Sequence, residues 1–291
     1  MSARSLAALS FTCAFAASPA PLPLPLSFWR FQEATGAPRL GDGFGATSPS
    51  ALLEGNASAP MERVAGGVFG AFSVRFDGGG GLNNSRRLAA SRAAAPALTV
   101  ALGGPNATVT VVAWVRALAQ GWGSSALVAG VWNEHAAARQ YALFTKLPAC
   151  NSAPVYAGGV AGHASNVGGP TPGDRFCETR ACDPRPLPRQ DWQCLAMAYD
   201  GAAIYAFLNG TLLKNGNDNP FAYPGGLFSP EAAGRVGAEF AVGANLINTT
   251  VGGLPHWSNL FEGDVGGLAV FAEGLADPAD VARICAFANG F

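Results

Sequence analysis

The stretch that most constrains the fold is residues 192–211, which read WQCLAMAYDGAAIYAFLNGT. Large apolar side chains at Leu195, Met197 and Tyr199 alternate with alanines, and this period of two places successive side chains on opposite faces of a strand. The dipeptides Asp-Gly at 200–201 and Asn-Gly at 209–210 readily adopt positive φ in tight hairpin turns. Two such turns within about ten residues predict an antiparallel β-meander, with which the remaining strands must pair.

Further strands are predicted along the whole chain from alternating or β-branched runs. We expect them at residues 28–31, 68–76, 108–116, 126–132, 140–146, 239–244 and 262–271. The run TVTVVAWVR at 108–116 is the most β-branched and is expected to be a central strand. The content of 38 Gly and 21 Pro also suits many short strands joined by turns.

One helix is predicted, close to the C-terminus. Asp277 is a suitable N-cap, and Pro278 would occupy the first helical position. Val281, Ile284 and Cys285 would then share one face. We expect this helix to plug an open end of a β-sandwich.

The first residues are typical of a secretory signal peptide. Arg4 supplies a short positive region, residues 6–15 an apolar core, and Ala-Phe-Ala at 14–16 a cleavage signature. We therefore predict a signal peptide over 1–17, with a buried N-terminal strand as the alternative, then a Pro/Leu-rich spacer over 18–27 and one domain over 28–291. Neither the apolar core nor any later segment is long enough to span a membrane, so a secreted, extracellular protein is expected. The net charge of −1 does not favour nucleic acid as a partner.

The order of several motifs resembles a known family. The segments FWRFQEATG, GVFGAFSVRFDG, TVVAWVR, RQYALFTK, DWQCLAMAYDG, IYAFLNGTL and FEGDVGGLAVFAEGLADPADV follow one another between residues 28 and 288. This order is similar to that of the laminin G-like jellyroll domain of the concanavalin A-like lectin/glucanase superfamily. The resemblance implies an all-β fold of two antiparallel sheets packed face to face as a jelly-roll sandwich. It also implies binding of glycans or other extracellular partners, often with calcium.

The resemblance to catalytic members of that superfamily is incomplete. Glycoside hydrolases of the superfamily carry an E-x-D-x-E or E-x-D-x-x-E cluster on one strand, and retaining hydrolysis needs two carboxylates about 5 Å apart. This chain has Glu262 and Asp264, followed by Gly266 and Gly267 where the third acid is expected. We therefore predict that the protein is not an enzyme.

Cysteines indicate an oxidising compartment. Five of the six lie outside the predicted signal peptide, at 150, 177, 182, 194 and 285. Cys177 and Cys182 could close a small loop, and Cys150 could reach Cys194, although spacing does not establish the connectivity and the odd number leaves one thiol over. A cysteine-based zinc site at 177–182 is the alternative, but it lacks a second ligand pair.

Five N-x-S/T sequons are candidate glycan acceptors in an exported chain. They stand at Asn56, Asn83, Asn106, Asn209 and Asn248. The alternative for each is that Asn and Ser/Thr simply favour turns.

Candidate ligand-binding residues are aromatic, amide and charged groups on expected loops, because sugars stack on aromatic faces and their hydroxyls need polar partners. They are Asn166, Asp174, Arg175, His256, Trp257 and Asn259. By family resemblance, Asp77 and Asp264 could ligate a structural calcium ion, but the position of each favours a turn residue. The expected function is a secreted carbohydrate-binding or adhesion module. A structural extracellular-matrix or cell-surface protein acting through protein contacts is the alternative, and a glycoside hydrolase or lyase is third. The ligand and the oligomeric state stay open.

Overall fold

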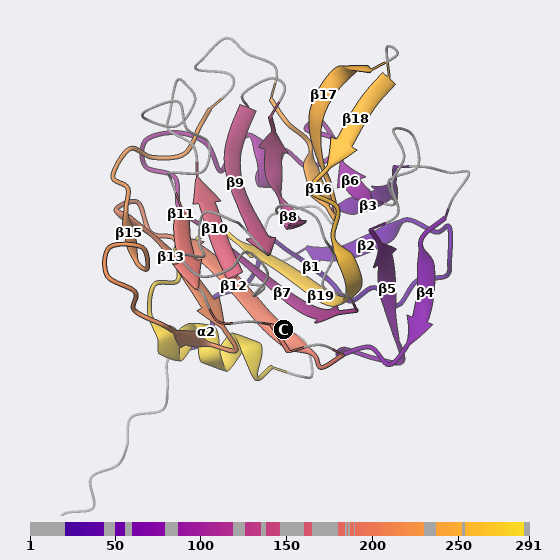
Figure 1. Cartoon of the computed structure of the whole chain (residues 1–291), viewed down its shortest axis with the longest axis horizontal. Coiled ribbons are helices and arrows are strands. Elements are labelled where there is room, and N and C mark those ends of the chain that lie inside the picture. The colour runs from indigo at the N-terminus through magenta and orange to yellow at the C-terminus, as the bar shows by residue number, and fades with distance from the viewer. Residues whose placement is uncertain are drawn as a thin grey trace, which may run out of the picture.

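The fold is known from a computed structural model, shown in Figure 1. The structure describes residues 21–43, 50–55, 60–78, 87–118, 126–134, 138–145, 160–164, 180–183, 185, 187–188, 190–229, 237–251 and 254–287.

Two layers of predominantly antiparallel strands pack face to face, as predicted. The first sheet contains β1 (Ser27–Trp29), β2 (Arg39–Gly43), β4 (Glu62–Ala65), β5 (Phe72–Asp77), β7 (Val109–Ala117), β12 (Gln193–Tyr199), β13 (Ala203–Leu208), β14 (Thr211–Leu212), β15 (Phe221–Ala222) and β19 (Glu262–Phe271). The second contains β3 (Ala51–Glu54), β6 (Leu88–Ala90), β8 (Ala126–Asn133), β9 (Ala138–Thr145), β10 (Val160–Ala164), β11 (Arg180–Asp183), β16 (Phe240–Val242), β17 (Asn245–Val251) and β18 (Leu254–Ser258). Pairing of β2 with β3 connects the two layers into one continuous ladder.

The β-branched strand β7 lies at the centre of the first sheet, between β12 and β19. Its odd-numbered residues 109–115 point into the core between the sheets, where Leu195 of β12 and Leu143 of β9 also lie. Val112 and Trp114 point to the outer face of the first sheet. The period of two read from the sequence therefore separates the interior from the outer face.

The predicted meander is confirmed as β12, β13 and β14. Asn209 and Gly210 both adopt positive φ (51° and 72°), as a two-residue hairpin turn requires. At the first turn only Gly201 has positive φ, 94°. There the Asp200 side chain accepts hydrogen bonds from the backbone N–H of Ala202 and Ala203 at 2.8 Å each. Because Tyr199 pairs with Ile204, this turn also has two central residues, Gly201 and Ala202, one position later than the predicted Asp200-Gly201 pair.

The predicted C-terminal helix is α2 (Pro278–Cys285), and the Asp277 side chain caps it by accepting from the Ala279 N–H at 2.8 Å. Its expected position is wrong. Val281 and Ile284 pack on Trp114 and Phe207, so α2 covers the outer face of the first sheet instead of an open end of the sandwich. A second, four-residue helix, α1 (Pro96–Thr99), follows β6 and was not predicted.

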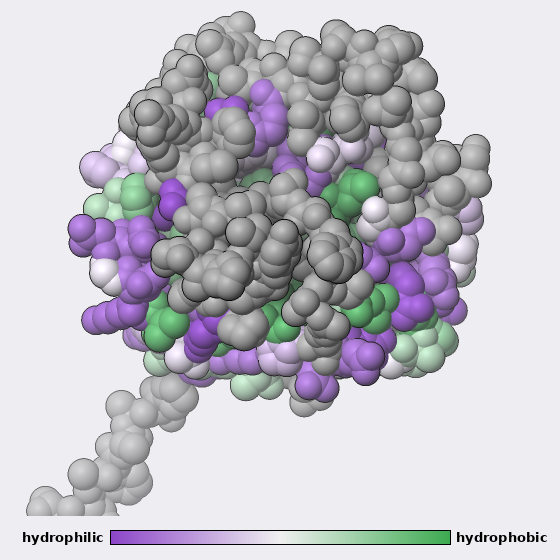
Figure 2. Space-filling model, in the orientation of Figure 1, coloured by the Kyte–Doolittle hydropathy of each residue, from purple (hydrophilic) through white to green (hydrophobic). Residues whose placement is uncertain are grey.

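The face of the molecule in Figure 2 is of mixed polarity. Figure 2 shows the apolar side chains of the described residues on one face as separate patches between hydrophilic ones. No helix in the described part of the chain is long and apolar enough to cross a membrane.

Candidate functional site

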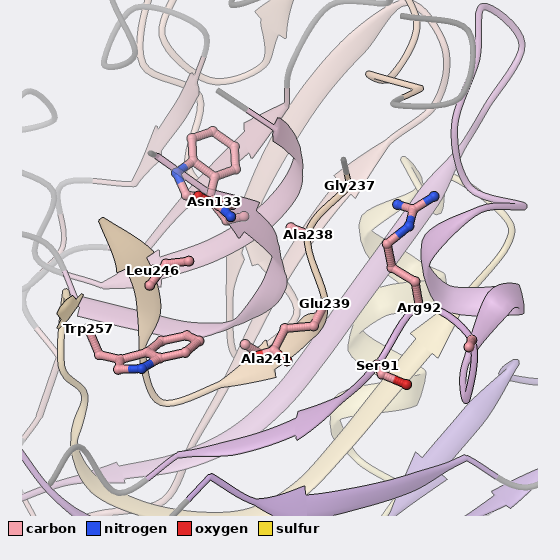
Figure 3. Close-up of a pocket in the computed structure, with 11 residues that line it drawn as sticks. Ser91, Arg92, Asn133, Gly237, Ala238, Glu239, Ala241, Leu246 and Trp257 are labelled. Atoms are coloured by element: carbon pink, nitrogen blue, oxygen red, sulfur yellow. The ribbon is translucent and has the colours of Figure 1, made fainter. Parts of the chain in front are cut away.

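A pocket of about 440 Å³ opens on the outer face of the second sheet. It is built from the segment after β6, the end of β8, the start of β16 and the β17–β18 hairpin (Figure 3). Its walls are formed by Ser91, Arg92, Ala93, Trp132, Asn133, Gly237, Ala238, Glu239, Ala241, Leu246 and Trp257. We call it the β16 pocket.

Strand alternation explains why the β16 pocket has room. Phe240 and Val242 of β16 point into the core, so Ala241 between them points outward. In the sheet, Ala241 is paired with Ala89 of β6 on one side and Gly130 of β8 on the other. Three small residues, Ala89, Ala241 and Gly130, therefore lie side by side on the outer face of the second sheet and leave space between the larger side chains of the pocket walls.

One wall of the pocket is the indole of Trp257, which Arg87 holds from behind. The Arg87 guanidinium carbon lies 3.4 Å from the centroid of the Trp257 ring, and its Nε lies 3.6 Å from a carboxylate oxygen of Glu239. Trp257 and Glu239 line the pocket, whereas Arg87 does not. Arg87 thus fixes an aromatic wall and an acidic group while leaving the other face of the indole to the pocket.

Burial shifts the titration of this ion pair. It raises the pKa of the Glu239 carboxyl, an effect that the Arg87 charge partly opposes. Burial also lowers the pKa of Arg87. Both shifts have the sign expected for charged groups removed from water.

Arg92 forms the opposite wall, across the strand segment 237–241 from Trp257 (Figure 3). A Cβ at Gly237 would overlap the Arg92 guanidinium, so glycine at this position lets Arg92 lie directly against the backbone. Burial lowers the pKa of Arg92. The β16 pocket therefore combines an indole face, a carboxylate and a guanidinium.

Trp132, the second indole of the pocket, is held by its own contacts. Its Nε1 donates to Glu134 at 2.5 Å, and the same carboxylate accepts from Nε of Arg139 at 2.5 Å. The ring also packs edge-on against Phe144, with centroids 5.6 Å apart. Only 3% of Trp132 is exposed, so it supports the pocket wall more than it offers a free face.

The ligand-binding residues predicted from the sequence fall into four groups. Trp257 lies in the pocket wall. Asn259 lies in the turn before β19 at φ 51°, and its amide donates to Asn245 at 2.7 Å, which indicates a role in the turn. His256 is in β18, where its backbone pairs with Asn248, and its side chain is outside the described atoms. Asn166, Asp174 and Arg175 lie outside the described residues.

Asp264, a predicted calcium ligand, is an ion-pair partner in this structure. Its carboxylate is fully buried, and both of its oxygens accept from guanidinium groups: Nε of Arg75 lies 2.8 Å from Oδ1, and Nη2 of Arg116 lies 2.7 Å from Oδ2. Asp77 is at the end of β5, paired with Glu262. Within the described ranges, no group of three or more His, Cys, Asp and Glu side chains lies close enough to hold a metal ion.

Packing explains the glycines that stand where the third acid was expected. Gly266 is the bulged residue of β19, between the pairs Val265–Val115 and Gly267–Trp114. A Cβ at Gly266 would approach the Trp192 ring to 2.9 Å, and one at Gly267 would overlap Phe69. Aromatic rings occupy the space that acidic side chains would need.

The expected pairing of Cys150 with Cys194 is wrong, because Cys194 forms a disulfide with Cys285 of α2. The apolar helix face predicted for Cys285 gave no indication of a partner 91 residues away. Cys182, in β11, is also disulfide-bonded. Its partner lies outside the described residues, as do Cys150 and Cys177, so the predicted Cys177–Cys182 pair stays a prediction.

Among the sequons, Asn106 is exposed on a turn before β7, and Asn209 is exposed on the β13–β14 turn. Asn248 is in β17, with its side chain outside the described atoms, and Asn56 and Asn83 lie outside the described residues.

The comparisons with known proteins concern the fold. No protein-family model matches the sequence. No curated protein matches it either.

Among solved structures, botulinum neurotoxin type C aligns with a TM-score of 0.50 and 7% identity, over 90% of this chain and 51% of the toxin chain. Trypanosoma rangeli sialidase aligns with a TM-score of 0.50 and 11% identity, over 92% of this chain and 34% of the sialidase. Domain 4 of the arabinanase AbnA from Geobacillus stearothermophilus aligns with a TM-score of 0.44 and 13% identity, over 77% and 81% of the two chains. At such identities the first two alignments show that this chain shares the β-sandwich fold of proteins that are otherwise distant from it.

Proposed function

We propose that the protein is a secreted, non-catalytic module of the laminin G-like type that binds glycans in the β16 pocket. The observation that carries the proposal is that Trp257 and Glu239 line the same pocket and that Arg87, outside the pocket, contacts both of them. Such a pocket offers an apolar face together with a few fixed polar groups, the combination that orients a sugar.

A pyranose ring would stack its C–H face on the open side of the Trp257 indole. Its hydroxyls would donate to the Glu239 carboxylate and accept from Arg92 on the opposite wall. A volume of about 440 Å³ is within the range for small-ligand pockets. Two fold neighbours supply context: cell entry of botulinum neurotoxin type C depends on two ganglioside molecules, and the sialidase holds 2,3-difluorosialic acid.

The proposal of binding without catalysis is supported by the carboxylates of the pocket. Among the described residues that line it, Glu239 carries the one carboxylate. Retaining glycoside hydrolysis needs a second carboxylate about 5 Å away. Asp264, on the other sheet, is neutralised by Arg75 and Arg116.

Export is proposed from the N-terminal pattern together with the Cys194–Cys285 disulfide, because structural disulfides persist mainly in oxidising compartments. A calcium ion, if one is bound, would need ligands other than the Asp264 carboxylate.

The test is glycan-array binding of the purified chain with and without calcium, followed by titration of any positive glycan against variants. Trp257→Ala removes the stacking face and is expected to weaken binding roughly tenfold or more. The matched control is Phe72→Ala, because the Phe72 ring also lies beside an arginine, with the Arg63 guanidinium carbon 3.3 Å from its centroid, but on β5 of the first sheet. Equal losses in both variants, or no glycan binding under either condition, would contradict the proposal and favour a protein partner.

A further inference from the structure

A second pocket, of about 360 Å³, lies on the opposite side of the molecule, where α2 meets the first sheet. It is formed by the start of β12, the β13–β14 turn and the C-terminal end of α2. We call it the α2 pocket. It is lined by Val68, Trp114, Trp192, Gln193, Cys194, Asn209, Ala282, Cys285 and Ala286.

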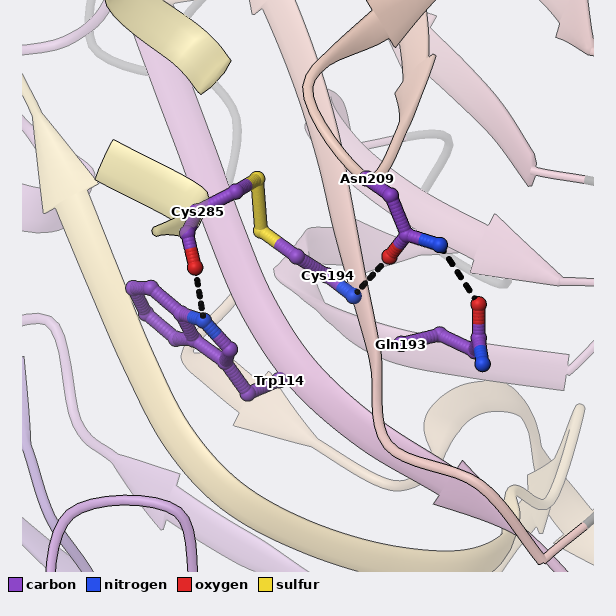
Figure 4. Close-up of a disulfide and its surroundings, with 5 residues drawn as sticks. All are labelled: Trp114, Gln193, Cys194, Asn209 and Cys285. Carbon is purple, nitrogen blue, oxygen red and sulfur yellow. Dashed lines mark hydrogen bonds between the residues drawn. A yellow bond between two sulfur atoms is a disulfide. The ribbon is translucent and has the colours of Figure 1, made fainter. Parts of the chain in front are cut away.

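Asn209 of the sequon Asn-Gly-Thr is held at the edge of the α2 pocket by three hydrogen bonds, and Figure 4 shows those of its side chain. Its Oδ1 accepts from the Cys194 N–H at 2.8 Å, and its own backbone N–H donates to the Cys194 carbonyl at 2.7 Å. Its Nδ2 donates to Oε1 of Gln193 at 2.7 Å. An amide nitrogen carries two hydrogens, so this bond to Gln193 uses only one of them.

The turn that carries Asn209 is fixed to the helix. A Cβ on Gly210 would overlap the backbone of Ala282 in α2, so only glycine permits this approach. The Cys194–Cys285 disulfide joins α2 to β12, to which the turn is hydrogen-bonded at Cys194. Trp114 Nε1 also donates to the Cys285 carbonyl at 3.2 Å (Figure 4). The orientation of the Asn209 side-chain amide relative to α2 is therefore well defined.

Trp192 gives the α2 pocket a sugar-binding surface. Its indole is partly exposed, with the Arg116 guanidinium carbon 4.8 Å from the ring centroid. Trp192 lines the pocket, whereas Arg116 does not. Beside the indole, the pocket offers the apolar side chains of Val68 and Ala282 and the amide of Gln193, which suits the C–H face and acetamido group of an N-acetylhexosamine.

The geometry points to Asn209 as an N-glycosylation site whose first N-acetylglucosamine lies in the α2 pocket against Trp192. In the transfer, a bond forms between Nδ2 and C1 of the sugar, and the bond from C1 to the diphosphate of a lipid-linked oligosaccharide donor breaks. The diphosphate leaves with the bonding electrons, and one Nδ2 proton passes to a base of the transferase. After the transfer, the one hydrogen left on Nδ2 can still be donated to Gln193, and Oδ1 can still accept from the Cys194 N–H. The inference rests on the proposed export, but not on glycan recognition in the β16 pocket.

Two variants distinguish the effect of the glycan from the effect of the Asn209 side chain. Thr211→Ala destroys the sequon but leaves the Asn209 hydrogen bonds intact, because the exposed Thr211 accepts from Arg185 through its backbone carbonyl. Asn209→Gln removes the glycan and the hydrogen bonds together. Asn106 is the internal comparator, because it is an exposed sequon that does not line either pocket.

The full chain would be secreted from a eukaryotic host, and site occupancy would be read by peptide mass spectrometry after enzymatic deglycosylation in heavy-oxygen water. We expect Asn209 to be glycosylated in the wild type. In Thr211→Ala the heavy-oxygen label should be lost at Asn209 and at no other sequon. The glycosylated wild type should melt about 2–4 °C above Thr211→Ala, a shift typical of a contact worth about 1 kcal/mol in a chain of this size. Trp192→Ala should keep the glycan and lose most of this difference.

Occupancy of Asn106 with an unmodified Asn209 would overturn the inference, as would an occupied Asn209 whose glycan leaves the melting temperature unchanged. Should Trp192→Ala fail to fold, Trp192→Phe and the rate of glycan release from the native wild type replace it. If the glycan is released enzymatically from Asn209 of the native protein as fast as from Asn106, the proposed contact between the first sugar and the α2 pocket is also refuted. Secretion with neither sequon occupied would count against the inference, whereas retention of the whole chain inside the cell would count against the proposed export.

Discussion

At the scale of single residues, the buried carboxylate of Asp264 links two strands of the first sheet. It joins Arg75 of β5 to Arg116 of β7, and the hydrogen bond from Arg75 raises the pKa of that guanidinium. Asp264→Asn keeps the shape but leaves two cations facing an uncharged amide. We expect the free energy of unfolding to fall by about 3 kcal/mol, measured by urea denaturation, because breaking a buried ion pair leaves its charges uncompensated.

The matched control for that prediction is Asp42→Asn. Asp42 forms an ion pair with Arg30 at 2.9 Å, but both side chains are more than 40% exposed. An exposed pair contributes at most about 1 kcal/mol, so this variant should stay close to the wild type. If both variants lose the same stability, the importance assigned to burial of Asp264 is wrong.

Sequence reasoning reached only part of the β16 pocket. Trp257 could be singled out because an aromatic next to His256 and Asn259 has the composition of a sugar-binding loop. Arg92, Glu239 and Arg87 were missed, because they meet only through the pairing of β16 with β6, about 150 residues apart in the chain. The one local signal was Trp132, a large aromatic at an outward position of β8 that no core pattern required.

At the scale of elements, the Cys194–Cys285 disulfide is expected to hold α2 on the first sheet. It closes a loop with a sequence separation of 91 residues, so the chain-entropy argument gives a stabilisation of about 4.6 kcal/mol. The double variant Cys194→Ala/Cys285→Ala should lose most of that free energy in urea unfolding. It should also show faster amide hydrogen exchange in α2 than in β7.

A helix that exchanges no faster in the double variant would show that its apolar face alone holds it in place. Val281→Ala is the control for that case, because it thins the packing of Val281 on the first sheet and leaves the disulfide intact. Loss of a buried valine side chain of this kind costs about 1–3 kcal/mol.

The elements differ in how far local sequence determines them. The meander and α2 were predicted correctly because Asn209-Gly210 and Asp277-Pro278 are local turn and capping signals. The position of α2 was not, because an apolar helix face indicates that something is buried without indicating against which surface. Short strands such as β3 and β11 were missed, since three or four residues carry no clear period and pair only once their neighbours are in place.

At the scale of the whole molecule, the tyrosines set the response to alkaline pH. Burial raises the pKa values of four of the five, Tyr141, Tyr199, Tyr205 and Tyr223. For Tyr205, burial, together with a 2.8 Å hydrogen bond to Asp200, raises the pKa to about 12. Below the pKa of an unfolded tyrosine, about 10, both states are protonated and stability does not depend on these groups.

Above pH 10 the unfolded chain releases phenolic protons that the folded chain retains, so the free energy of unfolding must fall as the pH rises. We expect the urea midpoint to be constant from pH 8 to 9.5 and to decrease from pH 10 to 11.5. Tyr205→Phe should lose about 1 kcal/mol at neutral pH with its hydrogen bond to Asp200, and then decline less steeply than the wild type. A midpoint that is flat to pH 11.5, or a decline that is equally steep in Tyr205→Phe, would mean that the folded core does not hold these hydroxyls protonated. Because these four hydroxyls are distributed over β9, β12, β13 and the segment after β15, the slope reports on the closure of the whole sandwich.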